Sequence, residues 1–323
     1  MKLSIKLIAL VLCLGLMACA LRGCGFQTQT DAPEAEEAIN VYATFYPIYA
    51  LAELIVEDVP NLKLNCLAQP MDGSFRTYSL SDWDLALLAQ SADAVISGGR
   101  GLESFASTLY ALGETGPAVA SVLYNLELAT VEPVNETGED SDSTGENPHI
   151  YMSIDGAIAI AERIAANMIV LDPEYGELYS KNLENAKNRL ESLREEMHAL
   201  TGDLRGRKVI VMHEALIYTA QEFDLDVELY YARESGSVLY DKELEDCIAM
   251  LTSCEARVIL IEKQAPEAFC KALEAAGFRL VALDVLSTRR ADEGAEGYFE
   301  AQRANARALA EAYSADADLE VKE

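Results

Sequence analysis

Residues 172–202 read DPEYGELYSKNLENAKNRLESLREEMHALTG and predict one long amphipathic helix near the middle of the chain. Asp172 can cap its start and Pro173 suits its first turn, while Gly202 tolerates the left-handed conformation in which many helices end. One apolar stripe at steps of three and four consists of Leu183, Ala186, Leu190, Leu193, Met197 and Leu200. About 30 residues at about 1.5 Å each would span ~45 Å, more than one small domain. We therefore expect this helix to connect two lobes, with the functional site between them.

Strands and helices alternate on both sides of this helix. Before it, strands are expected at residues 39–44, 62–67 and 94–97, and helices at 47–56, at 82–92 after a Ser81 cap, from 102 onward, and at 153–168. After it, strands are expected at 208–212, 227–229, 257–261 and 280–283, and helices ending at 223 and spanning 241–253, 266–276 and 297–313. This order predicts an α/β fold with two lobes, each with a mainly parallel sheet flanked by helices. The expected boundaries are 39–171 for the first lobe, 172–202 for a rigid linking helix and 203–323 for the second lobe.

Length and charge limit the classes of function. A chain of 323 residues exceeds the usual size of a single core, so two lobes of ordinary size are expected. The formal net charge of −29 argues against nucleic acid as a partner, because phosphates require a cationic surface. A negative surface is compatible with a cation as ligand, although it commonly serves only solubility.

The N-terminus predicts export and anchoring. Lys2 and Lys6 precede an apolar run at 7–17, which is shorter than the ~20 residues of a membrane-spanning helix and is typical of a signal peptide. The segment 16–19, LMAC, resembles a bacterial lipobox, so residues 1–18 would be removed and Cys19 would carry lipid. Cys24 is a weaker candidate for that role, and plain secretion is the alternative. Residues 19–38 then form a flexible tether, and the lipid attaches the protein to the membrane.

Four cysteines lie in the expected folded body, at positions 66, 247, 254 and 270. They form no CxxC pair, which excludes a zinc ribbon or a dithiol redox motif of that type. Export permits a disulfide, for example between Cys254 and Cys270, and free thiols are the alternative.

Residues 131–147 form an acidic, weakly hydrophobic segment that predicts a mobile loop. A solvated linker is the simpler interpretation. The alternative is that its carboxylates concentrate divalent cations near the site.

The chain has only three histidines. His198 lies among charged residues of the long helix and is expected to face solvent. His149 follows the acidic loop and His213 follows a predicted buried strand, while Asp284 follows the strand at 280–283. Ligands of open α/β sheets bind outside the carboxyl ends of the strands, so His149, His213 and Asp284 are candidate metal ligands, with hydrogen-bonded loop residues as the alternative.

Several segments together resemble a known family. The segments are 147–151 NPHIY, 209–215 VIVMHEA, 283–286 LDVL, 81–82 SD and 99–105 GRGLESF, with the long helix and the terminal helix in the matching order. They look like the metal-binding segments of the solute-binding lipoproteins of zinc and manganese ABC transporters. The resemblance covers nearly the whole mature chain.

This resemblance implies a protein whose two lobes hold one transition-metal ion and deliver it to an ABC transporter permease. His149 would be the ligand from the first lobe, and His213 and Asp284 the ligands from the second. Histidine at position 213 resembles the zinc branch of the family, because the manganese branch commonly has a carboxylate there, and imidazole suits zinc. Zn²⁺ is therefore the expected cargo, with Mn²⁺ as the alternative. The protein is expected to be a monomer, outside the cytoplasm, and not an enzyme.

The first ligand of the family is absent here. The family usually has a histidine shortly before the Ser-Asp pair, whereas residues 72–80 read DGSFRTYSL. Ser74 aligns best with that ligand, but serine is a poor zinc ligand. The fourth position would therefore be taken by water, by Asp72 after local rearrangement, or by nothing. The histidine-rich loop of many zinc-binding members is likewise replaced by the acidic segment.

Two other functions remain open. Three protein ligands and one open position also describe a catalytic zinc site, but no HExxH motif is present and Glu214 is not at helical ligand spacing to His213. A divergent member with lost or altered metal binding, acting as an adhesin or binding another ligand, is the stronger alternative. A rigid linking helix also implies little lobe closure, with release through movement of the loop around His149.

Overall fold

The computed structural model describes residues 38–68, 75, 78–130, 132–135, 145–233, 239 and 241–320, with side chains as far as 314. The predicted signal peptide, Cys19, Cys24 and the tether up to residue 37 lie outside the described residues, as do Asp72, Ser74 and most of the acidic segment. Among the helices of the described part, none is long and apolar enough to cross a membrane.

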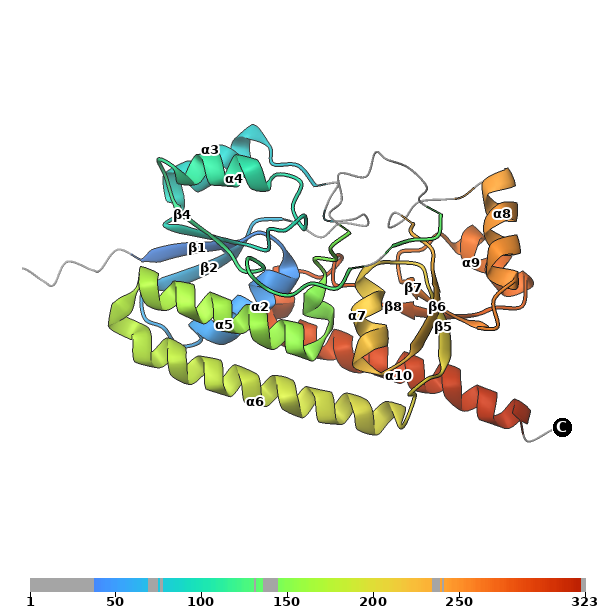
Figure 1. The fold of residues 1–323 in the computed structure, drawn as a ribbon. Helices are drawn as coiled ribbons and strands as arrows, with labels where there is room; N and C mark the ends of the chain where they lie inside the picture. The colour runs from blue at the N-terminus through green and yellow to red at the C-terminus, as the bar shows by residue number, and fades with distance from the viewer. Residues whose placement is uncertain are drawn as a thin grey trace, which may run out of the picture. The chain divides into compact units, whose positions relative to one another are not determined.

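The first lobe is a parallel sheet of four strands flanked by helices, as predicted (Figure 1). Its strand order is β2-β1-β3-β4, with β1 Ile39–Ala43, β2 Leu62–Cys66, β3 Ala94–Ser97 and β4 Ala118–Ser121. Its helices are α2 Tyr46–Val56, α3 Asp82–Ser91, α4 Ala106–Gly113, the 3-10 turn η2 Ile150–Met152 and α5 Ile154–Leu171. Strand β4 was not predicted, because this edge strand has only four residues and none of them is buried.

The second lobe repeats this arrangement. Its strand order is β6-β5-β7-β8, with β5 Lys208–Val211, β6 Asp226–Tyr230, β7 Val258–Glu262 and β8 Arg279–Leu283. Its helices are α7 Ala215–Glu222, α8 Asp241–Thr252, α9 Glu267–Ala275, the 3-10 turn η4 Ala291–Glu293 and α10 Gly294–Glu320. All five residues of β7 are buried, as expected for a central parallel strand covered on both faces. The predicted fold class is confirmed.

The long helix begins later than predicted. Helix α5 ends at Leu171, a 3-10 turn η3 spans Pro173–Tyr175, and α6 runs from Gly176 to Thr201. The Asp172 cap is wrong: the Asp172 side chain makes no capping hydrogen bond and instead accepts one from the Tyr179 hydroxyl at 2.9 Å. The stop at Gly202 is confirmed, with φ of 66°.

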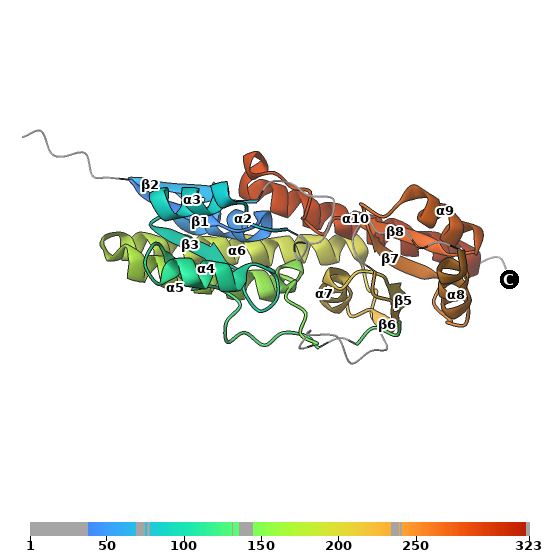
Figure 2. The same ribbon diagram turned by 90° about the horizontal axis from the view of Figure 1, so that it is seen from above.

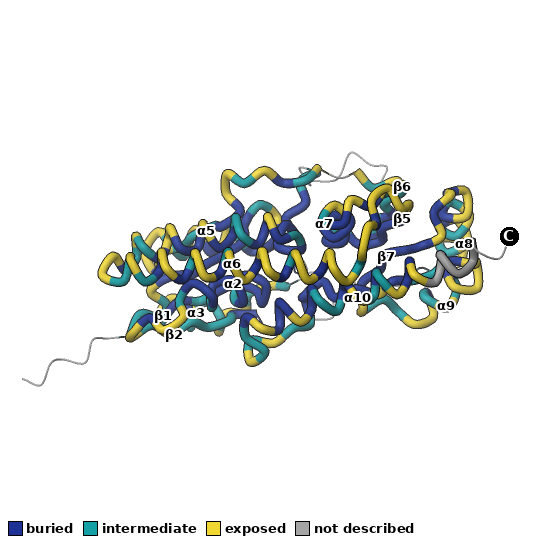
Figure 3. The backbone as a smooth tube through the Cα atoms, turned by 90° about the horizontal axis from the view of Figure 1, so that it is seen from below, coloured by how far each residue is buried: buried dark blue, intermediate teal, exposed yellow. Residues whose placement is uncertain are grey.

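The buried stripe of α6 is shifted toward the start of the helix, and its outer face is exposed (Figure 3). Leu200 is 42% exposed, contrary to expectation, and Leu183 is only partly buried. Asn182 is buried instead, because its side-chain amide donates to the carbonyls of Ile55 and Glu57 at the end of α2, at 3.0 and 2.7 Å. A polar residue thus satisfies backbone groups that a helix end leaves unpaired.

Helix α10 is a second connection between the lobes, which the sequence pattern did not indicate. It packs against α2 and α6 as well as against β8 (Figures 1 and 2). The Tyr46 hydroxyl of the first lobe donates to the Gly294 carbonyl at 2.8 Å, and the Tyr298 hydroxyl donates to the Tyr151 carbonyl at 2.8 Å. Both lobes belong to one compact unit that begins at Ala38.

Cys66, Cys247, Cys254 and Cys270 are free thiols, so the Cys254–Cys270 pair is not formed. Burial raises the pKa of Cys66 to about 12 and that of Cys247 to about 11. Both thiols are therefore protonated at neutral pH.

The described ends of the acidic segment contact both lobes. The Val134 amide donates to the Tyr230 carbonyl at 3.0 Å, and the Asn135 side chain exchanges two hydrogen bonds with Ala232 at 2.8 Å. Glu146 pairs with Arg100 in the first lobe. Val134 and Asn135 therefore lie against the second lobe.

Candidate metal centre

The structure brings His149 and His213 together from different lobes. His149 directly precedes η2 of the first lobe, and His213 lies in the turn between β5 and α7 of the second. Their ring centroids are 5.7 Å apart in an edge-to-face arrangement. Both side chains are enclosed, with 3% of His149 and 6% of His213 exposed. Two imidazoles therefore meet in a buried position where the lobes adjoin.

Asn147 holds the His149 ring in one orientation. The buried Asn147 amide oxygen accepts from the His149 backbone amide and lies 3.1 Å from His149 Nδ1. Glu214 Oε1 lies 3.6 Å from the same ring nitrogen. Because oxygen acceptors surround Nδ1, the neutral ring carries its hydrogen there, which leaves Nε2 as the nitrogen with a lone pair for a metal.

Asn147 also joins the two lobes. Its amide nitrogen donates to the Glu214 carbonyl at 2.7 Å, directly after His213 in the chain. The Tyr218 hydroxyl of α7 donates to the Asn147 carbonyl at 2.8 Å and accepts from the Ala129 amide at 2.9 Å. These bonds place the loop that carries His149 against the helix that follows His213.

The His213 ring has a different hydrogen-bonding arrangement. Its Nδ1 accepts a hydrogen bond from the Ala215 amide at 3.1 Å, in the first turn of α7. The neutral ring therefore carries its hydrogen on Nε2. A metal that binds through Nε2 requires that hydrogen to move to Nδ1 or the ring to turn, and either change breaks the bond to Ala215.

Asp284 follows β8 as predicted and is buried, but it is engaged by cationic groups. Its Oδ1 accepts from the Leu286 amide at 2.8 Å, in a turn where Leu286 has φ of 70°. Its Oδ2 lies 3.0 Å from Arg289 Nε and 3.9 Å from Lys263 Nζ. Arg289 also pairs with Glu293 at 2.5 Å. In this arrangement the charge of the Asp284 carboxylate is balanced within the protein.

The candidate ligands are thus assembled only in part. Within the described ranges, no group of three or more His, Cys, Asp or Glu side chains is placed to hold a metal ion. The chemistry of the two imidazoles fits a zinc-type ion, since His nitrogen is a preferred ligand of Zn²⁺. His198 lies elsewhere. Its side chain is exposed on α6, as predicted, and lies 3.7 Å from Glu222.

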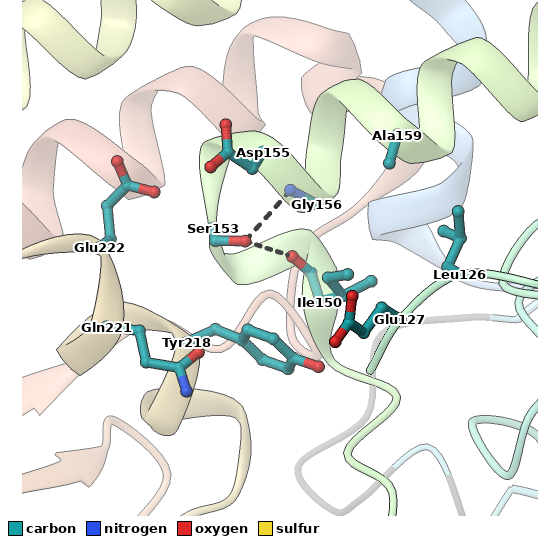
Figure 4. Close-up of a pocket in the computed structure, with 10 residues that line it drawn as sticks. All are labelled: Leu126, Glu127, Ile150, Ser153, Asp155, Gly156, Ala159, Tyr218, Gln221 and Glu222. Carbon is teal, nitrogen blue, oxygen red and sulfur yellow. Dashed lines mark hydrogen bonds between the residues drawn. The ribbon is translucent and has the colours of Figure 1, made fainter. Parts of the chain in front are cut away.

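A cavity of about 370 Å³ lies beside this centre, between the start of α5 and α7 (Figure 4). None of the candidate ligands lines it. On its wall, Ser153 caps α5 by accepting from the Gly156 amide at 3.2 Å, and Glu222 of the second lobe accepts from the Ile154 amide at 2.9 Å. The hydrogen bond from Ile154 to Glu222 is therefore a further contact between the two lobes.

Glu103 has a structural role within one of the family-like segments. It is buried, and its carboxylate accepts from the Thr44 hydroxyl and from the amides of Gly98 and Gly99 at 2.6–2.7 Å. Burial raises its pKa. Glu103 thus organises the glycine turn at the end of β3.

Comparison with known proteins supports a single family. The profile described as zinc-uptake complex component A, periplasmic, matches residues 41–312. The zinc-binding lipoprotein AdcA of Streptococcus pneumoniae is 23% identical over 314 residues, which are 94% of this chain and 60% of that protein. The high-affinity zinc uptake system protein ZnuA of Bacillus subtilis is 23% identical over 205 residues, 61% of this chain and 62% of that protein. The chain thus covers about three fifths of the length of these relatives.

Solved structures share the fold. The solute-binding protein FpvC of Pseudomonas aeruginosa in complex with Ni²⁺ matches with a TM-score of 0.73 and 23% identity, over 86% of this chain and 98% of that one. A mutant of the laminin-binding adhesin Lmb of Streptococcus agalactiae matches with a TM-score of 0.69 and 22% identity, over 85% and 99%. Identities this low establish the architecture and not the ligand.

Proposed function

From the premise that this chain belongs to the family of the periplasmic zinc-uptake component A, we propose that it is an extracytoplasmic solute-binding protein of a metal ABC importer. The proposed cargo is Zn²⁺, with Mn²⁺ as the alternative. The observation that carries the proposal is the meeting of His149 and His213, whose buried rings lie 5.7 Å apart across the lobes. The relatives are named for zinc binding and zinc uptake, and we propose no catalytic activity for this chain.

The proposed ligands are His149 from the first lobe and His213 and Asp284 from the second. The lobes are residues 39–171 and 203–323, with the linking segment 172–202 between them. A fourth position is left to water, Ser74 or Asp72. Zinc commonly takes nitrogen and carboxylate oxygen ligands in such a mixed set. Binding at Asp284 requires the metal to compete with Arg289 for the carboxylate.

Two bridging helices limit how the lobes can separate. Helices α6 and α10 pack against each other, and α10 contacts both lobes. We propose that metal enters and leaves through movement of the loop that carries His149, with release completed at a membrane permease. Lipid on Cys19 would hold the protein, as a monomer, at the membrane surface.

Calorimetric titration of the mature protein with zinc, after chelation and removal of the chelator, tests this function. We expect one zinc per chain bound with sub-micromolar affinity, and weaker binding of manganese, because two imidazoles favour zinc. Absence of heat at micromolar zinc would contradict the proposal. Turnover of ester or amide substrates that depends on zinc would replace it with an enzymatic function.

Removal of the cation beside Asp284 should strengthen binding. Arg289→Met keeps the apolar stem of the side chain and removes the charge that lies 3.0 Å from the Asp284 carboxylate, so zinc affinity should rise about tenfold, or ~1.4 kcal/mol. The same titration measures it. Arg290→Met is the matched control, because the neighbouring Arg290 is exposed and pairs with Asp292. An equal affinity change in both variants would mean that general surface charge, not the Asp284 pair, sets the effect.

A further inference from the structure

The hydroxyl of Tyr151 is buried and has no hydrogen bond to the part of the chain that the structure describes. The Tyr151 side chain is 0% exposed, and its Oη has no hydrogen-bond partner among the described residues. Its backbone is held, since the Tyr151 carbonyl accepts from the Tyr298 hydroxyl at 2.8 Å. A buried polar group with no partner is unfavourable, and phenylalanine would occupy the same space without that disadvantage. The hydroxyl therefore requires an explanation.

The Tyr151 ring lies next to that of His149, which in turn lies next to that of His213. Its centroid is 5.8 Å from that of His149, which is 5.7 Å from that of His213. A phenol hydroxyl can act both as a hydrogen-bond donor and as an acceptor.

The proposed ligand set lacks one member. Three protein ligands would leave one position of a tetrahedral zinc ion open, and water fills that position in enzymes whose zinc has three protein ligands. A metal-bound water needs a hydrogen-bond partner, and a ligand set is oriented by such outer contacts. Tyr151 has a hydroxyl without a partner among the described residues, on a ring that lies beside His149.

We propose that the Tyr151 hydroxyl hydrogen-bonds the water that occupies the fourth coordination position of the bound metal. The inference rests on the proposed function and deepens it, because it assigns the group that compensates for the histidine missing from the first lobe. Tyr151 is in this sense a positioning residue that acts through the water. The phenol replaces part of the stabilisation that a fourth imidazole would provide.

The variant Tyr151→Phe tests the inference through two measurements with opposite expected directions. Zinc titration should show affinity about tenfold weaker than that of the wild type, because the metal-bound water loses its partner. Thermal unfolding of the chelated protein should show an equal or higher midpoint, because a buried hydroxyl without a partner has been removed. A residue with a merely structural role would not give both results.

Tyr179→Phe is the matched control. Tyr179 is also fully buried, but its hydroxyl donates to Asp172 at 2.9 Å. This variant should unfold at a lower temperature and bind zinc with wild-type affinity. In the protein loaded with Co²⁺, the visible ligand-field absorption should change in Tyr151→Phe and remain unchanged in Tyr179→Phe.

The outcomes distinguish failure of the Tyr151 role from failure of the proposed function. Wild-type zinc affinity and an unchanged cobalt spectrum in Tyr151→Phe would overturn the role of Tyr151, while zinc binding by the wild type would leave the proposed function intact. If the wild type itself bound neither zinc nor cobalt, the proposed function would fail, and the role of Tyr151 with it.

Discussion

Replacement of His213 by alanine is expected to reduce zinc affinity by at least a hundredfold, because it removes one of the two imidazoles that meet at the lobe junction. His149 would then face a site with no second nitrogen ligand. Loss of a ligand exceeds the 10- to 100-fold cost that is typical of outer contacts around a metal. Titration of the chelated variant with zinc measures the effect, and circular dichroism establishes that the variant is folded.

His198→Ala is the control for this variant. The His198 side chain is exposed on α6 and lies 3.7 Å from Glu222, which is not one of the three candidate ligands. It should bind zinc as the wild type does. Equal losses in His198→Ala and His213→Ala would show that the proposed centre is misplaced.

Asn147→Leu is expected to weaken zinc binding by about 10- to 100-fold, although Asn147 is not a ligand. The leucine removes the oxygen that lies 3.1 Å from His149 Nδ1 and that holds the ring with Nε2 toward the metal. It also leaves the Glu214 carbonyl without the Asn147 donor at 2.7 Å, which should reduce the free energy of unfolding by about 1–3 kcal/mol. Zinc titration and urea denaturation of the chelated protein measure the two effects separately.

Asn182→Leu distinguishes lost affinity from lost stability. Asn182 is a buried asparagine whose amide donates to two carbonyls at the end of α2, far in sequence from the histidines. It should lose a similar free energy of unfolding and keep wild-type zinc affinity. Weaker binding in Asn182→Leu by the same factor would indicate that any destabilisation disturbs the centre, and Asn147 would lose its special role.

Local patterns predicted most of the elements. Residues 94–97 are a strand as expected, because the apolar run 94–96 between turn signals fits a central parallel strand, and all four residues, including Ser97, are buried. Ser81 caps α3 as predicted, since the capping box with Asp84 depends only on residues three positions apart. The Asp172 cap failed because a short 3-10 turn intervenes, and the Asp172 carboxylate instead binds Tyr179.

The position of each histidine was predictable from the local pattern, since His213 follows a recognisable strand and His149 follows a recognisable loop. Their approach was expected only from the family resemblance, because they belong to different lobes and no sheet edge is common to both. The engagement of Asp284 by Arg289 was not predictable, although only five positions separate them. It depends on the left-handed turn at Leu286 that brings the guanidinium back to the carboxylate.

The sequence by itself determined the alternation of strands and helices, the two parallel sheets and the two histidine positions, because each depends on neighbouring residues and on the period of the apolar pattern. Only the tertiary structure decided which groups surround the site. The return of α10 to the first lobe, the Asn147 bond to Glu214 and the buried hydroxyl of Tyr151 all depend on contacts between segments far apart in the chain. Such contacts leave no local periodicity, so the long helix that first indicated two lobes could not reveal what holds them together.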